Sequence, residues 1–90
     1  MHVVLVLQLR RTEPSGESIG FHLDFHRRTM QIPLCDEDSY DGGKLVFATP
    51  AGLKFPPRAA GSVTIHDKSI AHGVTAHLRG VRYGLFFLDF

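Results

Sequence analysis

Several features are scarce in this chain of 90 residues, and each scarcity excludes a class of protein. Its single cysteine, Cys35, can form neither an internal disulfide nor a cysteine zinc site, which excludes a disulfide-stapled secreted miniprotein. The longest apolar run, residues 3–7, is far too short to span a membrane, and it lacks the small-residue cleavage site of a signal peptide. We therefore expect a cytoplasmic protein without a membrane partner.

Long runs of like charge are also missing. The formal net charge is +1, and basic residues adjoin only in the pairs Arg10-Arg11 and Arg27-Arg28. Proteins that follow a phosphate backbone need a basic patch or stripe, so we predict no nucleic-acid partner. Hydrophobic residues make up 43% of the chain and charged residues 21%, which is typical of a small folded domain rather than a disordered tail.

No segment shows the apolar spacing and capping residues of a helix. Short apolar or alternating segments recur instead, about every ten residues, separated by turn residues. They are residues 3–10, 21–25, 30–34, 45–47, 61–67, 71–74 and 82–90, with at most an edge strand in the proline-rich segment 50–57. This pattern predicts a single all-β domain over residues 1–90, a jelly roll of seven or eight short strands with little or no helix.

The first chemical signal is the sequence His22-Leu23-Asp24. Residues two apart on a strand point to the same side, so an imidazole and a carboxylate would enter one cavity. His72, at the start of a predicted strand, offers a third donor. Two histidines and one carboxylate form the facial triad of non-haem Fe(II) oxygenases. On spacing alone, a surface pair of His22 and Asp24 without a metal remains the alternative.

The second signal is Arg82, which opens a strongly apolar strand. A guanidinium that faces inward among phenylalanines needs an anion, because an unpaired buried charge costs several kcal/mol. The carboxylate of a ligand, held by the planar guanidinium, would meet that need. The alternative is that Arg82 points to solvent from the end of the strand.

Taken together, these segments resemble a known family, the 2-oxoglutarate- and Fe(II)-dependent dioxygenases, and within it the prolyl-4-hydroxylase-like branch. The resemblance covers about residues 19–88. It rests on the order and spacing of His22-x-Asp24, Tyr40-Asp41-Gly42-Gly43-Lys44-Leu45, Gly61, His72-Gly73-Val74 and Gly80-Val81-Arg82-Tyr83.

The resemblance implies a cupin-like double-stranded β-helix, with catalytic Fe(II) on His22, Asp24 and His72, and with Arg82 on the distal carboxylate of the cosubstrate 2-oxoglutarate. The reaction it implies uses O₂ to hydroxylate a C–H bond of a peptide or small molecule, and releases succinate and CO₂. Ascorbate is a candidate reductant.

The chain departs from the family pattern at three points. Gly84 stands where many members have Ser or Thr, so a second hydrogen bond to the cosubstrate must come from elsewhere, with Gln31 and Thr64 as candidates. Leu88 replaces an arginine found in nucleic-acid demethylases, which speaks against such a substrate. The His-x-Asp motif also comes early, which predicts a core without the helical support that precedes it in the family.

A second class of function remains open: a cupin-like metal-binding module, or a non-catalytic fragment that needs a partner. Arg82 discriminates between the classes, because a cupin does not need this cation. The other histidines have simpler interpretations. His26 lacks the helix that would pair it with His22 on zinc, His66 is predicted to be a polar strand-end residue, and His77 to be solvated in a loop.

Alternation along residues 82–88 has a further consequence. If the arginine faces inward, Tyr83, Leu85 and Phe87 lie on the outer face of the strand. We expect a second copy of the chain, or a missing helical segment, to cover this apolar face. The alternative is that the loop 49–60 folds over it.

Overall fold

A computed structural model describes residues 4–90, so the first residue of the strand predicted from residue 3 lies outside the described part. The described residues form ten strands and one 3₁₀ helix. These are β1 (Leu5–Thr12), β2 (Ile19–His22), β3 (Arg28–Pro33), η1 (Glu37–Ser39), β4 (Asp41–Gly42), β5 (Leu45–Thr49), β6 (Gly52–Lys54), β7 (Thr64–Asp67), β8 (Ala71–Val74), β9 (His77–Arg79) and β10 (Arg82–Asp89).

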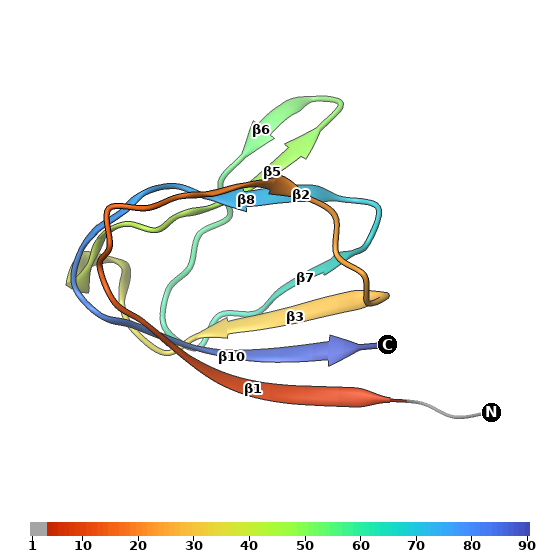
Figure 1. The fold of residues 1–90 in the computed structure, drawn as a ribbon, viewed down its shortest axis with the longest axis horizontal. Coiled ribbons are helices and arrows are strands. Elements are labelled where there is room, and N and C mark those ends of the chain that lie inside the picture. Colours follow the sequence, from red (N-terminus) through yellow and green to blue (C-terminus); the bar gives the residue numbers. More distant parts are fainter. Residues whose placement is uncertain (1–3) are drawn as a thin grey trace.

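The strands form two four-stranded sheets that face each other (Figure 1). The first sheet has the order β1-β10-β3-β7 and the second the order β2-β8-β5-β6, and every pairing is antiparallel. The chain crosses between the two sheets repeatedly, which is the winding of a jelly roll. The predicted all-β jelly roll is therefore confirmed. No helix in the described part is long and apolar enough to cross a membrane.

The strand count differs from the predicted seven or eight because of β4 and β9. These strands are two and three residues long and pair only with each other. Segments this short contain too few residues for an alternating pattern to show. The short β6 lies at the edge of the second sheet and has a neighbouring strand on one side only. Prolines are tolerated near such an edge strand, because its other side makes no ladder of hydrogen bonds.

The space between the sheets is lined largely by polar side chains. Strand β3 illustrates this, because Thr29 and Gln31 are buried while Met30 and Ile32 on its other face are only half-buried. The buried hydrophobic residues are Tyr40, Leu45, Val46 and Leu88, and the buried polar ones are Thr29, Gln31, Arg58, His66, His72 and His77. Burying polar groups is costly unless they find partners, so an interior of this kind is suited to holding a polar ligand.

The outer face of the first sheet is apolar and open. Leu7 is paired with Phe87, Phe87 with Met30, and Met30 with Ile65 in one row across the four strands. Leu7 is 59% exposed and Ile65 is 64% exposed. This agrees with the outward placement of Leu85, Phe87 and Tyr83 expected from alternation along β10.

The loop 49–60 does not cover Tyr83, which is 41% exposed. Its residue Arg58 is instead buried between the sheets, where it contacts Gln31. The alternative in which this loop closes the outer face is therefore wrong, because the segment turns inward after the hairpin of β5 and β6 (Figure 1).

Candidate metal centre

The two histidines of the predicted triad come together through strand pairing in the second sheet. His22 at the end of β2 is directly opposite His72 on β8, and their ring centroids are 4.3 Å apart. Asp24 reaches them by a different route from the one predicted. Strand β2 ends at His22, so Asp24 is supplied by the loop that follows, and the argument from two residues on one strand face is wrong for this pair.

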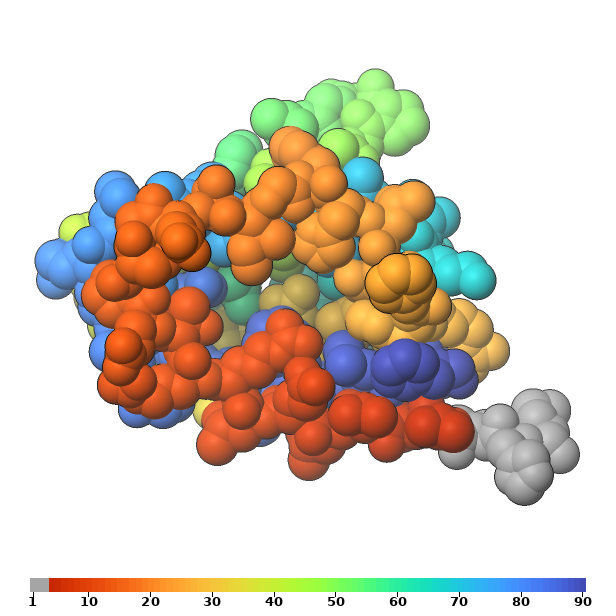
Figure 2. Space-filling view, viewed as in Figure 1, coloured from red at the N-terminus to blue at the C-terminus, as the bar shows by residue number. Residues whose placement is uncertain are grey.

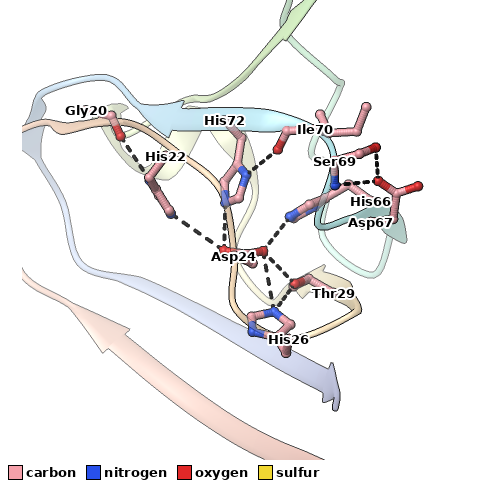
Figure 3. Close-up of polar contacts among 10 residues, drawn as sticks. All are labelled: Gly20, His22, Asp24, His26, Thr29, His66, Asp67, Ser69, Ile70 and His72. Atoms are coloured by element: carbon pink, nitrogen blue, oxygen red, sulfur yellow. Dashed lines mark hydrogen bonds and ion pairs between the residues drawn. The ribbon is translucent and has the colours of Figure 1, made fainter.

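The donor atoms of these three residues lie close together (Figure 3). Oδ1 of Asp24 is 3.3 Å from Nε2 of His72 and 3.7 Å from Nε2 of His22, and one ligand atom from each residue lies within 4.8 Å of the others. Donors at about 2.0–2.2 Å from a metal and at right angles to one another would lie about 3 Å apart. A small contraction of the observed arrangement would therefore accommodate an ion.

The protonation of both rings also suits a metal. Nδ1 of His22 lies 2.9 Å from the carbonyl oxygen of Gly20, and Nδ1 of His72 lies 3.1 Å from that of Ile70. A carbonyl oxygen accepts a hydrogen, so each Nδ1 carries the proton and each Nε2 presents a lone pair. The two Nε2 atoms and the Asp24 carboxylate then direct lone pairs at one point, where a cation would balance them. Backbone hydrogen bonds of this kind orient metal-ligating histidines.

The other carboxylate oxygen of Asp24 is held by the protein. Oδ2 lies 2.9 Å from Nε2 of His66 and accepts a hydrogen bond of 3.0 Å from the hydroxyl of Thr29. His26 is also close, with Nε2 at 3.4 Å from Oδ2. Burial raises the pKa of Asp24, but the hydrogen bonds from His66 and Thr29 and the nearby His72 outweigh it, and the pKa is lowered from its ordinary value. Asp24 is therefore a carboxylate with Oδ1 directed to the triad.

Sequence reasoning missed the part played by His66. It does lie near the end of a strand, as predicted, but it is buried and donates to Asp24 from β7 in the opposite sheet. Because its Nε2 carries this hydrogen, His66 differs from the two triad histidines, in which Nδ1 carries the proton. No local pattern connects residues that lie 42 positions apart, so only the fold could reveal this contact.

His77 corrects another prediction. The sequence predicts a solvated loop residue, but His77 lies in β9 and is only 3% exposed. Its ring packs edge-on against Tyr40, with centroids 6.2 Å apart, away from the triad. The ladder between β4 and β9 buries it, and neither strand is long enough to be recognised from alternation.

Arg82 faces the interior, as alternation along β10 predicted. Its Nη1 donates a hydrogen bond of 3.0 Å to the carbonyl oxygen of Gly43, and its Cζ lies 5.6 Å from the ring centre of Tyr40. The buried Nε has no hydrogen-bond partner among the described residues. A Cβ on Gly43 would lie 2.8 Å from this Nε, and Gly43 has a φ of +59°, so a glycine at this point gives the arginine its room.

The triad and Arg82 line one cavity of about 240 Å³ between the sheets. At about 30 Å³ for each water, this equals the volume of about eight waters, which is room for a small organic acid. Gln31 lines the cavity as well, whereas Thr64, the other candidate for a second cosubstrate contact, does not. Figure 2 shows the molecular surface hollowed between β1 and the segment that ends in β2.

The fold and the donors together define a class of site: a jelly roll whose cavity is lined by an exposed histidine, a buried histidine and a carboxylate, the donor set of the non-haem Fe(II) facial triad. Sequence comparison agrees with this class, because the chain is similar to proteins named PKHD-type hydroxylases. It is 34% identical to one from Pseudomonas putida strain W619, over 80% of this chain and 38% of that protein. It is 38% identical to one from Synechococcus sp. strain CC9605, over 77% of this chain and 35% of that protein.

The chain thus spans well under half the length of these curated relatives. No protein-family profile matches it. Among solved structures, a 2OG-Fe(II) oxygenase family oxidoreductase from Burkholderia pseudomallei is similar in fold, with a TM-score of 0.79 at 21% identity over 97% of this chain and 43% of that one. A cupin domain from Bordetella pertussis has a TM-score of 0.63 at 16% identity, over 96% of this chain and 81% of that one.

Proposed function

We propose that this chain is the core of an Fe(II)- and 2-oxoglutarate-dependent oxygenase of the prolyl-4-hydroxylase-like branch. In this proposal His22, Asp24 and His72 hold the iron, and Arg82 binds the distal carboxylate of 2-oxoglutarate. The observation that carries the proposal is the convergence of the three donor atoms within 4.8 Å in the cavity that Arg82 also lines. The similarity to named hydroxylases supports the same reaction class.

Each residue has a distinct task. The carbonyl oxygens of Gly20 and Ile70 keep the two histidine rings in the tautomer that presents Nε2. His66 and Thr29 hold one oxygen of Asp24, which leaves Oδ1 for the ion. Arg82 offers a fixed positive charge at a distance from the triad. There it would bind one carboxylate of a diacid and so set the orientation in which the diacid binds.

When bound, iron and 2-oxoglutarate would supply, with O₂, the oxidising chemistry that hydroxylates a C–H bond and yields succinate and CO₂. Ascorbate would keep the iron reduced. We propose that residues 1–90 form a single core domain that acts on a peptide or small molecule in the cytoplasm.

The deciding experiment is an anaerobic titration of the protein with Fe(II) and 2-oxoglutarate. A visible metal-to-ligand charge-transfer band should appear only when both are present, and His72→Ala should abolish it. Absence of the band in wild-type protein that binds Fe(II) would contradict the proposal.

A second candidate, a cupin-like site that holds metal without the cosubstrate, is favoured by the cupin neighbour, of which this chain spans 81%. That function would leave metal binding intact and give no charge-transfer band with 2-oxoglutarate. The same titration therefore separates the two candidates.

A further inference from the structure

The cavity contains a second buried arginine that the proposed function does not use. Arg58 is 6% exposed and lies in the segment that crosses from the second sheet to the first. Its Nη2 donates a weak hydrogen bond of 3.3 Å to Oε1 of Gln31, and its buried Nε has no partner among the described residues. Arg58 lines the same cavity as Arg82.

The two arginines line this cavity near each other, and both lie near Tyr40. The charge of Arg58 is close enough to disfavour the charged form of Arg82, and the phenol of Tyr40 is close enough to favour both. Burial lowers the pKa of each guanidinium, and Arg58 lowers that of Arg82 further. Two like charges buried together are costly, and they persist only when an anion or a set of hydrogen bonds compensates them.

The carboxylates of the described residues supply only part of that compensation. The charge of Glu37 favours charged Arg58, but its Oε1 accepts a hydrogen bond of 3.0 Å from the backbone nitrogen of Arg58 and none from the guanidinium. Asp24 is the acidic residue that lines the cavity, and its Oδ2 is engaged by His66. A third arginine of the cavity, Arg10, stacks at 3.9 Å on the ring of Phe86 and is influenced by Asp24, so it lies near the triad.

We infer that Arg58 and Arg82 together form a two-arginine cradle for one carboxylate of a small diacid. This inference rests on the proposed function, because the diacid in question is the cosubstrate. Arg58 then supplies a second contact to that carboxylate, which Gly84, also in the cavity wall, has no side chain to make. Gln31, held against Arg58, positions its guanidinium.

The cradle can be tested apart from the metal. Glutarate is a diacid with the same chain length as 2-oxoglutarate, but it lacks the keto group that would take part in chelating iron. Calorimetric titration of metal-free protein with glutarate should show binding that weakens about ten- to hundredfold in Arg58→Gln and in Arg82→Gln. Arg27→Gln, which removes an equal charge from an exposed arginine, should bind glutarate as the wild type does.

A second variant keeps the test independent of the stability of Arg58→Gln. Gln31→Glu places a carboxylate beside Arg58 and fills the cradle from within the protein. It should raise the melting temperature and abolish glutarate binding, while Co(II) titration of the triad remains unchanged.

Wild-type affinity for glutarate in Arg58→Gln or in Gln31→Glu would overturn the cradle, as would wild-type protein that does not bind glutarate. Glutarate binding that depends on Arg58, without a charge-transfer band on adding Fe(II) and 2-oxoglutarate, would leave the cradle standing and contradict the oxygenase proposal. The two failures are therefore distinguishable.

Discussion

Nε2 of His66 lies 2.9 Å from Oδ2 of Asp24, across the space between the two sheets (Figure 3). This contact turns the carboxylate so that Oδ1 faces the two triad histidines. Removing a residue that hydrogen-bonds a metal ligand commonly weakens metal affinity ten- to hundredfold.

The first prediction follows from this contact. His66→Leu should weaken Co(II) binding about ten- to hundredfold, because Asp24 loses its strongest orienting partner. His66→Gln, which can still donate to Oδ2, should lose less. Affinity is measured from the absorption of Co(II) during titration. His77→Gln, a change at another buried histidine away from the triad, is the matched control and should bind Co(II) normally. Equal affinities in wild type and His66→Leu would show that His66 does not orient Asp24.

The second prediction concerns metal and stability. An ion that binds only the folded protein should stabilise it by about 2.7 kcal/mol at one hundred times its dissociation constant. We therefore expect the melting temperature to rise on adding Co(II) and to fall again with a chelator. His72→Ala should abolish this response. A rise of the same size in that variant would place the ion elsewhere.

The third prediction separates Arg82 from the triad. Arg82→Lys keeps the charge but loses the planar group of donors, so it should weaken 2-oxoglutarate binding while leaving Co(II) affinity unchanged. Gly43→Ala should act in the same direction, because the new Cβ would collide with the guanidinium of Arg82. Titration of metal-free protein gives the Co(II) affinity, and calorimetry with Co(II)-loaded protein gives the affinity for 2-oxoglutarate. If Arg82→Ala binds 2-oxoglutarate as tightly as wild type, Arg82 is not the cosubstrate anchor.

The fourth prediction concerns the open outer face of the first sheet. Burying one large apolar side chain is worth about 1.5–3 kcal/mol, so this face, which includes the exposed Leu7 and Leu9, favours a covering partner. We expect concentration-dependent self-association in sedimentation velocity, reduced by the double change Leu7→Glu and Leu9→Lys. Leu53→Lys, at an equally exposed leucine on the other sheet, is the control and should leave association unchanged. A wild-type chain that stays monomeric at high concentration would contradict this expectation.

The fold class could be predicted from local information. Alternation and turn residues depend on near neighbours in the chain, so the order of residues alone indicates the long strand of residues 82–90 and the lack of an apolar helical face. The candidate ligands could also be named from local information, His22 and Asp24 from their residue types and His72 from its place at the start of a predicted strand, although the same-face argument for the first two was wrong. The inward direction of Arg82 followed from alternation along its strand.

The sequence by itself therefore determined the all-β class, the choice of candidate donors and the placement of apolar residues on both faces of β10. The tertiary structure decided what surrounds them. The structure shows that Asp24 comes from a loop, that His66 holds it and that Arg58 lies near Arg82. These arrangements depend on contacts between segments far apart in the chain. Side-chain proximity of this kind arises from the winding of two sheets around one cavity, and no local pattern of residues encodes it.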